Sequence, residues 1–442
     1  MFQNKKIFIL GMARSGYEVA KLLVSYGNDV LVVDGKEQEK EKVEELEKLG
    51  VKVAITNNQI DLLDETYDVM VKNPGIKYDN PLVLKARKLN IEVVNELEVA
   101  YSLLDKKVNI IGVTGSNGKT TTVTLIKEFL SKEFKNVFLC GNIGLPLSAI
   151  LKDIKDNDIL VIEISDHQLC DMYKFKTNIS VLLNISETHI DFHDSYERYK
   201  QMKKRIFNNH NDDIAILNKE NLEVINLAKD INDQKKYFSS KQEANCYLLN
   251  DKIIYNNETV VDIKDIKLKG IHNYENIMAA ILVVKEFGIK NTSIKEVLSE
   301  FVGVEHRIEF VRELNGVKYY NDSKSTNNKA TMTALSSFVE PIILLMGGLD
   351  RNIPFDDLKP YMKNVKKIEC FGETKEKIAA LASSLNIEYK IFDTMDLAIK
   401  DAYQSSIKGD IVLLSPACAS WDQYESFEKR GEEFKHIVNE FK

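Results

Sequence analysis

The chain has few cysteines and no pattern that would use them. Its five cysteines are an odd number, and no two of them form a Cys-x-x-Cys pair. A disulfide framework and a cysteine zinc site are therefore both disfavoured. We expect reduced thiols, most of them buried.

Long apolar runs and a positive charge excess are also missing. The longest apolar stretches, such as 342–346, are far shorter than the roughly 20 residues that span a membrane. The segment 1–6 does not lead into the apolar core of a signal peptide. With 60 basic and 67 acidic residues, the net charge of -7 gives no positive field for nucleic acid or an anionic membrane. We expect a cytoplasmic monomer without a membrane span and without a nucleic-acid partner.

What remains is the composition of a globular α/β protein. The 442 residues are 44% hydrophobic and 29% charged, and this length exceeds what a single core usually supports. Strand-like and helix-like segments alternate in three series, without short repeats or low-complexity segments. We therefore predict three α/β domains, at residues 1–98, 99–304 and 305–442.

The first series begins as a nucleotide-binding unit. A buried strand at 6–10 runs into the turn Gly11 to Gly16 and a helix at 17–26, and a second strand at 29–33 ends on Asp34. Ala13 replaces the middle glycine of the dinucleotide fingerprint, and this disfavours a nicotinamide-dependent oxidoreductase, because that glycine permits close approach of the pyrophosphate.

The second series carries a phosphate-binding loop, Thr114 to Thr121, between a strand at 108–113 and a helix at 121–131. Backbone N–H groups and a helix N-terminus form an anion site at such a junction. Lys119 would neutralise the β- and γ-phosphates of a nucleotide, and the Thr120 hydroxyl would bind its magnesium ion. Val113 occupies the position where the common pattern has its first glycine, so a glycine-rich turn without a ligand is the alternative.

Polar residues follow the next strands at the same predicted sheet edge. Glu163 ends the strand 159–163, and Asn184 and His189 follow the strand 179–183. Ligands of open α/β sheets bind at this carboxyl edge, so Glu163 and His189 are candidate magnesium ligands. Without these neighbours, a single loop histidine is more often an ordinary surface residue.

Residues 235–268 show short alternating segments and turn signals at 250–251 and 256–257. They predict a small antiparallel sheet appended to the second domain. After a helix at 275–287, the third series begins near Glu305 and includes strands at 342–345, 367–371 and 411–414.

Four motifs together resemble the Mur ligase family, which builds the peptidoglycan stem peptide. They are Thr114 to Thr121, Gly141-Asn142-Ile143-Gly144, Glu163 and His272-Asn273-Tyr274-Glu275-Asn276. The resemblance covers essentially the whole chain. It implies an N-terminal Rossmann-like domain that binds the UDP precursor, a central P-loop-type ATPase domain, and a C-terminal Rossmann-like domain that binds the amino acid and ATP.

The tail 414–431 is similar to that of the family members that add D-glutamate to UDP-N-acetylmuramoyl-L-alanine. No Asp-Asn-Pro-Arg motif of the diaminopimelate-adding members occurs. A related ligase for another amino acid, a folylpolyglutamate synthetase and a non-catalytic UDP-precursor-binding protein remain alternatives.

The resemblance also implies site residues. The catalytic set is Lys119, Glu163, His189 and Lys203, and the magnesium ligands are Thr120, Glu163, His189 and a carbamate on Lys203. ATP would contact Gly115, Ser116, Asn117, Gly118, Lys119, Thr120, Thr121, Asn276, Arg307, Asp322 and Lys324. The UDP substrate would contact Arg14, Ser15, Asp34, Gly35, Lys36, Asn73, Gly75, Asn142, Ser165 and Gln168. D-glutamate would contact Thr326, Arg351, Ser420, Trp421 and Phe427.

Two features of the implied site need explanation. An ammonium cannot ligate a metal ion, whereas a carbamate on Lys203 could. Without the resemblance to the family, the Lys-Lys-Arg run at 203–205 predicts a solvated helix face. The family usually has Ser-Ser-Phe-Gln at 165–168, and here Asp166 and His167 replace the middle pair. We expect them beside the substrate channel.

Overall fold

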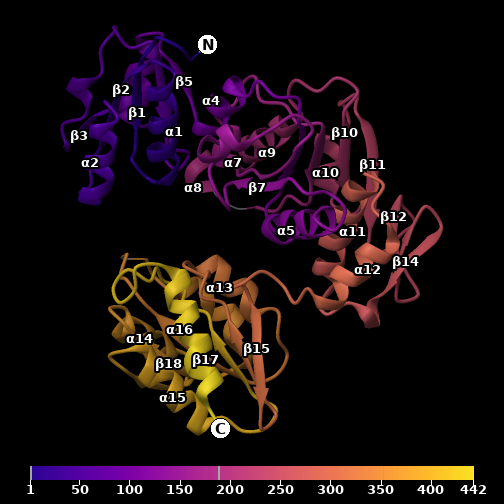
Figure 1. The fold of residues 1–442 in the computed structure, drawn as a ribbon. Coiled ribbons are helices and arrows are strands. Elements are labelled where there is room, and N and C mark those ends of the chain that lie inside the picture. Colours follow the sequence, from indigo (N-terminus) through magenta and orange to yellow (C-terminus); the bar gives the residue numbers. More distant parts are fainter. Residues whose placement is uncertain (1, 188–189, 352) are drawn as a thin grey trace. The chain divides into compact units, whose positions relative to one another are not determined.

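The computed structural model describes residues 2–187, 190–351 and 353–442. The chain forms two compact units, residues 1–301 and 302–442. The first unit contains a five-stranded and a nine-stranded sheet, and the second contains a six-stranded sheet (Figure 1).

The N-terminal sheet is parallel, in the order β3-β2-β1-β4-β5. Successive residues of β1 point to opposite faces: Ile7 and Ile9 join one core with α1, and Phe8 and Leu10 join another with α3. Because both faces are covered, the strands are continuous apolar runs. The elements are β1 (Lys6–Leu10), α1 (Arg14–Ser25), β2 (Asp29–Asp34), α2 (Lys40–Lys48), β3 (Lys52–Ile55), β4 (Val69–Lys72), α3 (Pro81–Lys88), β5 (Glu92–Val94) and α4 (Glu96–Leu103).

The nine-stranded sheet has the order β14-β13-β12-β11-β10-β9-β6-β8-β7. Its strands are β6 (Asn109–Thr114), β7 (Val137–Gly141), β8 (Ile159–Glu163), β9 (Ile179–Leu182), β10 (Ile214–Asn218), β11 (Gln234–Ser239), β12 (Cys246–Leu249), β13 (Lys252–Tyr255) and β14 (Glu258–Asp262). Its helices are α5 (Lys119–Leu130), α6 (Leu147–Ile150), α7 (Asp166–Leu169), α8 (Ile190–His193), α9 (Tyr196–Lys204), α10 (Leu222–Leu227), α11 (Ile271–Lys285) and α12 (Asn291–Glu300).

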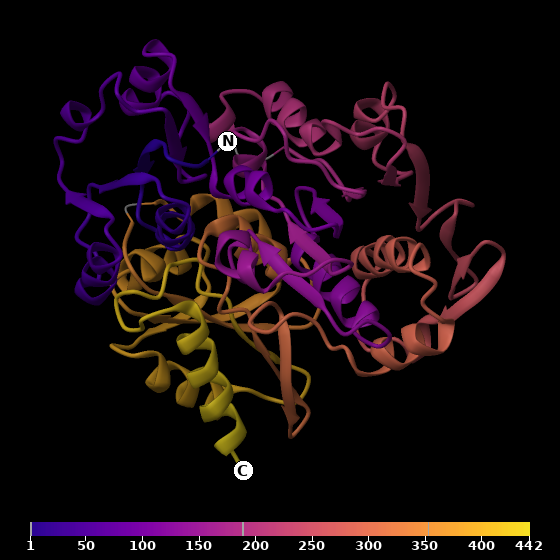
Figure 2. The ribbon, with the colours of Figure 1, turned by 45° about the horizontal axis from the view of Figure 1, so that its top comes forward.

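The antiparallel strands expected at 235–268 are present, but they continue this sheet and do not form one of their own. Strand β11 pairs in parallel with β10, β12 pairs in parallel with β11, and only β12, β13 and β14 pair antiparallel. Figure 2 shows these strands at the edge of the sheet, next to α11 and α12.

Helix α4 ties the N-terminal sheet to the nine-stranded sheet within the first unit. Asn95, its N-cap, donates a hydrogen bond to the Gln168 carbonyl oxygen at 2.5 Å. The Glu98 carboxylate accepts hydrogen bonds from the backbone N–H groups of Lys174 at 2.7 Å and Phe175 at 3.0 Å. The predicted domain boundary after residue 98 falls inside this helix.

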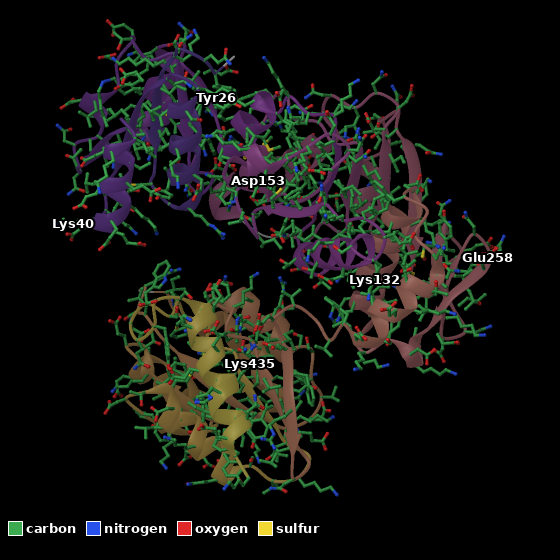
Figure 3. All side chains as sticks on the ribbon, viewed as in Figure 1. Tyr26, Lys40, Lys132, Asp153, Glu258 and Lys435 are labelled. Atoms are coloured by element: carbon green, nitrogen blue, oxygen red, sulfur yellow. The ribbon has the colours of Figure 1, made fainter. Side chains whose placement is uncertain are left out.

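The C-terminal sheet has the order β15-β16-β20-β17-β18-β19, with only β15 antiparallel to its neighbour. Lys435, which Figure 3 labels on α16, forms an ion pair of 3.1 Å with Glu309 on β15. The elements are β15 (Glu309–Leu314), β16 (Val317–Asn321), α13 (Asn328–Leu335), β17 (Ile342–Gly347), β18 (Val365–Phe371), α14 (Lys375–Ser384), β19 (Glu388–Ile391), α15 (Met395–Ser405), β20 (Ile411–Leu414) and α16 (Phe427–Glu440).

The five cysteines are free thiols, and four of them are buried, as expected. Among the described helices, none combines the length and the apolar character that a membrane crossing requires.

Candidate active site

The phosphate-binding loop joins β6 to α5 through two glycines with positive φ. Gly115 has a φ of +155° and Gly118, the N-cap of α5, has a φ of +86°. A Cβ atom at Gly118 would lie 2.2 Å from Oδ1 of Asn276 on α11. The loop therefore needs glycine here for both its backbone angle and its contact, and Asn276 lies against the loop.

The segment after β9 and helix α9 fix the first half of the loop. The backbone N–H groups of Ser116 and Asn117 donate to the carbonyl oxygen and Oδ1 of Asn184, at 2.9 and 2.8 Å. The Ser116 and Tyr199 hydroxyls hydrogen-bond at 2.6 Å. Since these N–H groups are already engaged, an anion would bind mainly at the first turn of α5, where N–H groups have no helical acceptor.

Lys119 folds back over this loop. Its Nζ donates hydrogen bonds to the carbonyl oxygens of Gly115 at 2.7 Å and Ser116 at 3.0 Å. The ammonium is thus held beside the first turn of α5, where it adds positive charge to that of the helix N-terminus.

Glu163 lies at the centre of a small polar group at the carboxyl edge of the sheet. Its Oε2 accepts a hydrogen bond from Thr120 Oγ1 at 2.8 Å, and its Oε1 accepts one from Asn142 Nδ2 at 2.7 Å. Glu163 is only 2% exposed. A carboxylate and a hydroxyl next to a phosphate loop are the oxygen ligands that Mg²⁺ prefers, so these two residues fit the metal role expected for them. Asn142, expected at the UDP substrate, contacts the metal candidate Glu163.

Lys203 is buried, which corrects the solvated helix face that its sequence neighbours predict. The side chain is 0% exposed. Its Nζ donates hydrogen bonds to Thr114 Oγ1 and to the Gly115 carbonyl oxygen, both at 3.1 Å, and lies 3.2 Å from Asp166 Oδ1. Burial lowers the pKa of Lys203, and the charge of Asp166 opposes this shift. Lys203 therefore lies directly behind the phosphate loop.

Asp166 is also buried, at 1% exposure, and its Oδ1 faces Lys203. Its Oδ2 hydrogen-bonds His193 Nε2 at 2.8 Å, and His167 Nε2 lies 3.6 Å away. The expected position of Asp166 and His167 beside the substrate channel stays a prediction. One potential ligand atom each from Asp166, His167 and His193 lie within 4.8 Å of one another, but the Lys203 ammonium beside Asp166 opposes a cation there. His189, the remaining predicted magnesium ligand, lies outside the described residues.

Ser165 and Gln168 form hydrogen bonds with each other. The Gln168 backbone N–H donates to Ser165 Oγ at 3.3 Å, and the Ser165 backbone N–H donates to Gln168 Oε1 at 2.9 Å. This is a capping box at the start of α7, and it turns Asp166 into the first helical turn. Both residues were expected at the UDP substrate, and both are largely buried.

The other residues expected at the UDP substrate follow β1, β2 and β4 in the N-terminal sheet. Asp34 accepts backbone hydrogen bonds from Met12 at 2.7 Å and Lys36 at 2.9 Å. Asn73 Nδ2 donates to Ser15 Oγ at 3.5 Å, and Asn73 Oδ1 accepts from the Gly75 N–H at 3.1 Å. These strand ends lie at one sheet edge, where the connections diverge to β2 and β4, and the N-terminus of α1 begins there at Arg14. Such an edge binds nucleotides in open α/β sheets.

In the C-terminal unit, Asp322 follows β16 and is 1% exposed. Its Oδ2 accepts a hydrogen bond from Ser415 Oγ at 2.7 Å, and its Oδ1 accepts one from the Ile308 N–H at 3.2 Å. Burial raises the pKa of Asp322 to about 6, although the positive charge of Arg307 acts in the opposite direction. The predicted ATP residues Arg307 and Asp322 are therefore neighbours.

The predicted D-glutamate residues take part in two cation–ring pairs in the same unit, one of them with Lys324, which is predicted to contact ATP. The Arg351 guanidinium lies 5.0 Å from the Trp421 ring centre, and Lys324 Nζ lies 5.9 Å from the Phe427 ring centre. Trp421 is 63% exposed and Ser420 is buried. For Thr326 the structure gives a backbone hydrogen bond to the Lys324 carbonyl oxygen at 2.9 Å.

Arg430 is a buried residue next to the predicted site segments, and the sequence assigned it no role. It is 0% exposed, and its guanidinium donates to the Ser323 carbonyl oxygen at 2.9 Å and the Cys418 carbonyl oxygen at 3.0 Å. It thereby joins α16 to the two segments that carry Lys324 and Ser420. The only signal in the sequence was its place in the tail motif 427–431.

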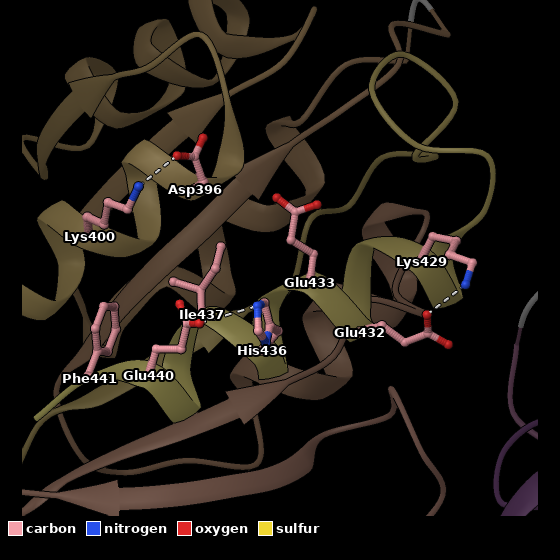
Figure 4. Close-up of a pocket in the computed structure, with 9 residues that line it drawn as sticks. All are labelled: Asp396, Lys400, Lys429, Glu432, Glu433, His436, Ile437, Glu440 and Phe441. Atoms are coloured by element: carbon pink, nitrogen blue, oxygen red, sulfur yellow. Dashed lines mark hydrogen bonds and ion pairs between the residues drawn. The ribbon is translucent and has the colours of Figure 1, made fainter.

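A groove of about 650 Å³ between α15 and α16 contains none of the predicted site residues (Figure 4). Several of its charged side chains pair with each other, as Lys400 does with Asp396 at 3.0 Å and Lys429 with Glu432 at 3.0 Å. Nothing in its lining indicates a ligand.

Three family profiles match successive parts of the chain. They are "Mur ligase MurD-like, N-terminal domain" at residues 5–95, "Mur ligase middle domain" at residues 113–284, and "Mur ligase, glutamate ligase domain" at residues 306–418.

Similar proteins match the chain from end to end. The UDP-N-acetylmuramoylalanine–D-glutamate ligase of Geobacillus sp. (strain WCH70) is 44% identical, covering 100% of this chain and 99% of that protein. The ligase of the same name from Listeria monocytogenes (strain EGD-e) is 42% identical, covering 100% and 97%.

Solved structures support the fold. The UDP-N-acetylmuramate–alanine ligase MurC of Thermotoga maritima has a TM-score of 0.61 at 19% identity, covering 98% of this chain and 99% of that one. The MurF ligase of Thermotoga maritima, solved with ADP, has a TM-score of 0.55 at 17% identity, covering 99% and 96%.

Proposed function

The chain belongs to the Mur ligase family, and on this premise we propose that it joins D-glutamate to UDP-N-acetylmuramoyl-L-alanine with the consumption of ATP. The observation that carries this proposal is the full-length identity of 42–44% to ligases of that name. The activity belongs to the synthesis of peptidoglycan precursors.

The reaction transfers the γ-phosphate of ATP to the substrate carboxylate and releases ADP. The amine of D-glutamate then attacks the acyl phosphate, and phosphate leaves from the tetrahedral intermediate. In this proposal Lys119 and the first turn of α5 hold the phosphates of ATP, and Thr120 and Glu163 hold its magnesium ion. The bound metal ion would offset the negative charge that develops during phosphoryl transfer.

We further propose that Arg351 binds a carboxylate of D-glutamate, with Thr326, Ser420, Trp421 and Phe427 completing that site. The exposed stack of Arg351 on Trp421 supports this role, since a guanidinium can bind a carboxylate through two parallel hydrogen bonds. The UDP group would bind at the N-terminal sheet edge, between the start of α1 and the Asp34 and Asn73 loops.

The family implies a carbamate on Lys203, and this modification stays a prediction. A carboxylate, Asp166, already lies 3.2 Å from Nζ as a counter-charge. The magnesium set that we propose contains Thr120 and Glu163, with His189 and the Lys203 carbamate as further expected ligands.

A cytoplasmic location follows from this proposal, because ATP and nucleotide-linked precursors are cytoplasmic compounds. The monomeric state and the domain boundaries after residues 98 and 304 remain predictions.

Mass spectrometry of the product tests the proposed function. Incubation with ATP, Mg²⁺, D-glutamate and UDP-N-acetylmuramoyl-L-alanine should yield the precursor extended by one glutamyl residue. Glutamylation of a folate and not of the UDP precursor would favour the folylpolyglutamate synthetase alternative. Tight precursor binding without any product would favour a binding protein.

A further inference from the structure

Lys72 is a buried lysine that none of the predicted sites includes. It is the last residue of β4, directly before Asn73, and it is only 1% exposed. Its Nζ donates a hydrogen bond to the Ile76 carbonyl oxygen at 2.7 Å and forms an ion pair of 3.0 Å with Asp171 Oδ2. A buried ammonium needs partners for its N–H donors and its charge. Lys72 has one partner in the turn that follows it and another in Asp171.

The turn that follows Lys72 consists of residues 73–76. The Ile76 N–H donates to the Asn73 carbonyl oxygen at 3.0 Å and closes the turn. Lys72 Nζ lies 2.7 Å from the Ile76 carbonyl oxygen and 3.4 Å from the Asn73 carbonyl oxygen, so the ammonium contacts both ends of the turn. Asn73 and Gly75 are expected at the UDP substrate. Lys72 therefore holds a turn that carries two of the predicted UDP residues.

The opposite side of this turn packs against the end of β1. The Asn73 N–H donates to the Leu10 carbonyl oxygen at 2.9 Å. Gly11 has a φ of +96°, and a Cβ atom there would lie 2.9 Å from Asn73 Cβ. Glycine is therefore needed at this position for its backbone angle and for the close approach of the turn. The turn is thus fixed by β1 on one side and by Lys72 at its carbonyl groups.

Asp171 connects Lys72 to the segment that follows the proposed metal ligand Glu163. Asp171 is 1% exposed and follows α7, which begins at Asp166 shortly after the end of β8. Its carbonyl oxygen accepts a hydrogen bond from the Asn95 N–H at 3.3 Å, so its backbone is also held. The ion pair therefore joins the turn 73–76 to the part of the chain that leads from Glu163.

A second contact joins the same loop to α9. The guanidinium carbon of Arg198 lies 3.5 Å from the ring centre of Tyr78, which comes two residues after the turn. This distance is within the range of a cation–π contact. The loop that begins at Asn73 is therefore contacted by two segments of the nine-stranded sheet, one after α7 and one in α9.

We propose that the Lys72–Asp171 ion pair positions the turn 73–76 for the uridine end of the UDP precursor, so that Lys72 and Asp171 are positioning residues for this substrate. This inference rests on the proposed function. Lys72 acts through the Ile76 carbonyl oxygen, because its own ammonium is buried. Substrate-binding groups need such support, since a small displacement of the group that holds a substrate weakens binding and orientation.

Calorimetry with UDP-N-acetylmuramoyl-L-alanine and, separately, with ADP tests this role without turnover. Lys72→Met removes the donor to the Ile76 carbonyl oxygen and should weaken precursor binding by about tenfold or more, whereas ADP binding should stay within about twofold of the wild type. Asp171→Asn should also weaken precursor binding, because it leaves the ammonium without its counter-charge. Unchanged precursor binding in Lys72→Met, or an equal loss for ADP, would overturn the proposal.

The double variant Lys72→Met with Asp171→Leu separates positioning from stability. Replacing both partners of a buried ion pair by apolar residues is often neutral or stabilising, so the double variant should unfold at a higher temperature than either single variant. Its precursor affinity should stay low, because the Ile76 carbonyl oxygen still lacks its donor. Affinity that recovers together with stability would show that the pair only stabilises the fold, and the proposal would fail. If a single variant did not fold, the double variant would still decide.

Asp233→Asn is the matched control. Asp233 forms another buried pair in the same unit, between its Oδ2 and His210 Nδ1 at 2.7 Å, and it precedes β11. The substitution should lower the thermal stability and leave precursor binding unchanged. An equal loss of precursor affinity in Asp233→Asn would show that the loss of any buried pair has this effect, and the proposal would fail.

Binding and turnover by the wild-type chain are measured separately. A wild-type chain that bound the precursor and did not add D-glutamate would contradict the proposed function, while the comparison of the variants would still stand. A wild-type chain without affinity for the precursor would contradict both.

Discussion

Thr120 Oγ1 donates a hydrogen bond of 2.8 Å to Glu163 Oε2, and this contact joins the first turn of α5 to the end of β8. The pairing of β6 with β8 thus brings a hydroxyl and a carboxylate together, although the residues are 43 positions apart in the sequence. A magnesium ion bound there would be within reach of nucleotide phosphates at the helix N-terminus.

Glu163→Gln should lower kcat by about a hundredfold or more, because the amide keeps the shape and loses the charge that binds the metal ion. Phosphate release at saturating ATP, measured over a magnesium titration, checks this prediction. Glu275→Gln is the control, since Glu275 is a carboxyl group on α11 that hydrogen-bonds Ser240 at 2.7 Å. Equal losses in the two variants would argue against the metal role.

Gly118→Ala should weaken ATP binding by about tenfold or more, because the new Cβ would lie 2.2 Å from Asn276 Oδ1 and displace the loop. Gly288→Ala is a control with a similar positive φ of +76° and no heavy atom within 4 Å of the added Cβ. Both variants should lose about 1 kcal/mol of stability from backbone strain, but only Gly118→Ala should lose nucleotide affinity, as measured by calorimetry with ADP. Unchanged affinity in Gly118→Ala would remove this loop from the ATP site.

Arg351→Ala should raise the KM for D-glutamate by about thirtyfold, which corresponds to about 2 kcal/mol for the loss of one charged partner. The KM for ATP should change little. Lys390→Ala removes another cation–ring pair of this unit, Lys390 with Phe392 at 5.3 Å, and should leave both constants unchanged. A selective rise in the KM for ATP would assign Arg351 to the nucleotide.

Asp322 should make the stability of the C-terminal unit depend on pH. Burial raises its pKa from an ordinary 3.8 to about 6, so the folded unit holds the proton more tightly than the unfolded chain. This contribution to stability is fully present below the unfolded pKa and is lost as the pH rises through about 6. A shift of about two pH units corresponds to about 3 kcal/mol.

Urea unfolding at a series of pH values compares the wild-type chain with Asp322→Asn. The stability of the wild type relative to the variant should decrease from about pH 4 to about pH 7, since asparagine carries no titrating proton. A relative stability that increases over this range would show that the carboxylate is better stabilised than its burial implies.

Local patterns were sufficient to predict the strand ends that carry the site. The loop after β6 and Glu163 at the end of β8 follow from apolar runs that end in polar residues, and the structure has both at one sheet edge. The continuation of the sheet into β11–β14 was not predictable in this way, because it depends on pairing between β11 and β12 and not on either strand alone.

The Asp166–Lys203 pair illustrates why the rest of the site could not be read from the sequence. These residues lie on separate short helices, and only their packing against the phosphate loop brings the charges together. By contrast, the Ser165 and Gln168 capping box has a local signature, Ser-x-x-Gln, that predicts a helix start at Asp166. That signature would have predicted the hydrogen bonds between Ser165 and Gln168.

Phosphate release with a panel of amino acids tests the central claim most directly. The purified chain should release phosphate from ATP with UDP-N-acetylmuramoyl-L-alanine and D-glutamate together, and only at background rate when D-glutamate is replaced by L-glutamate, L-alanine or L-lysine. Equal release with L-alanine or L-lysine would contradict the assignment of this chain as a D-glutamate ligase.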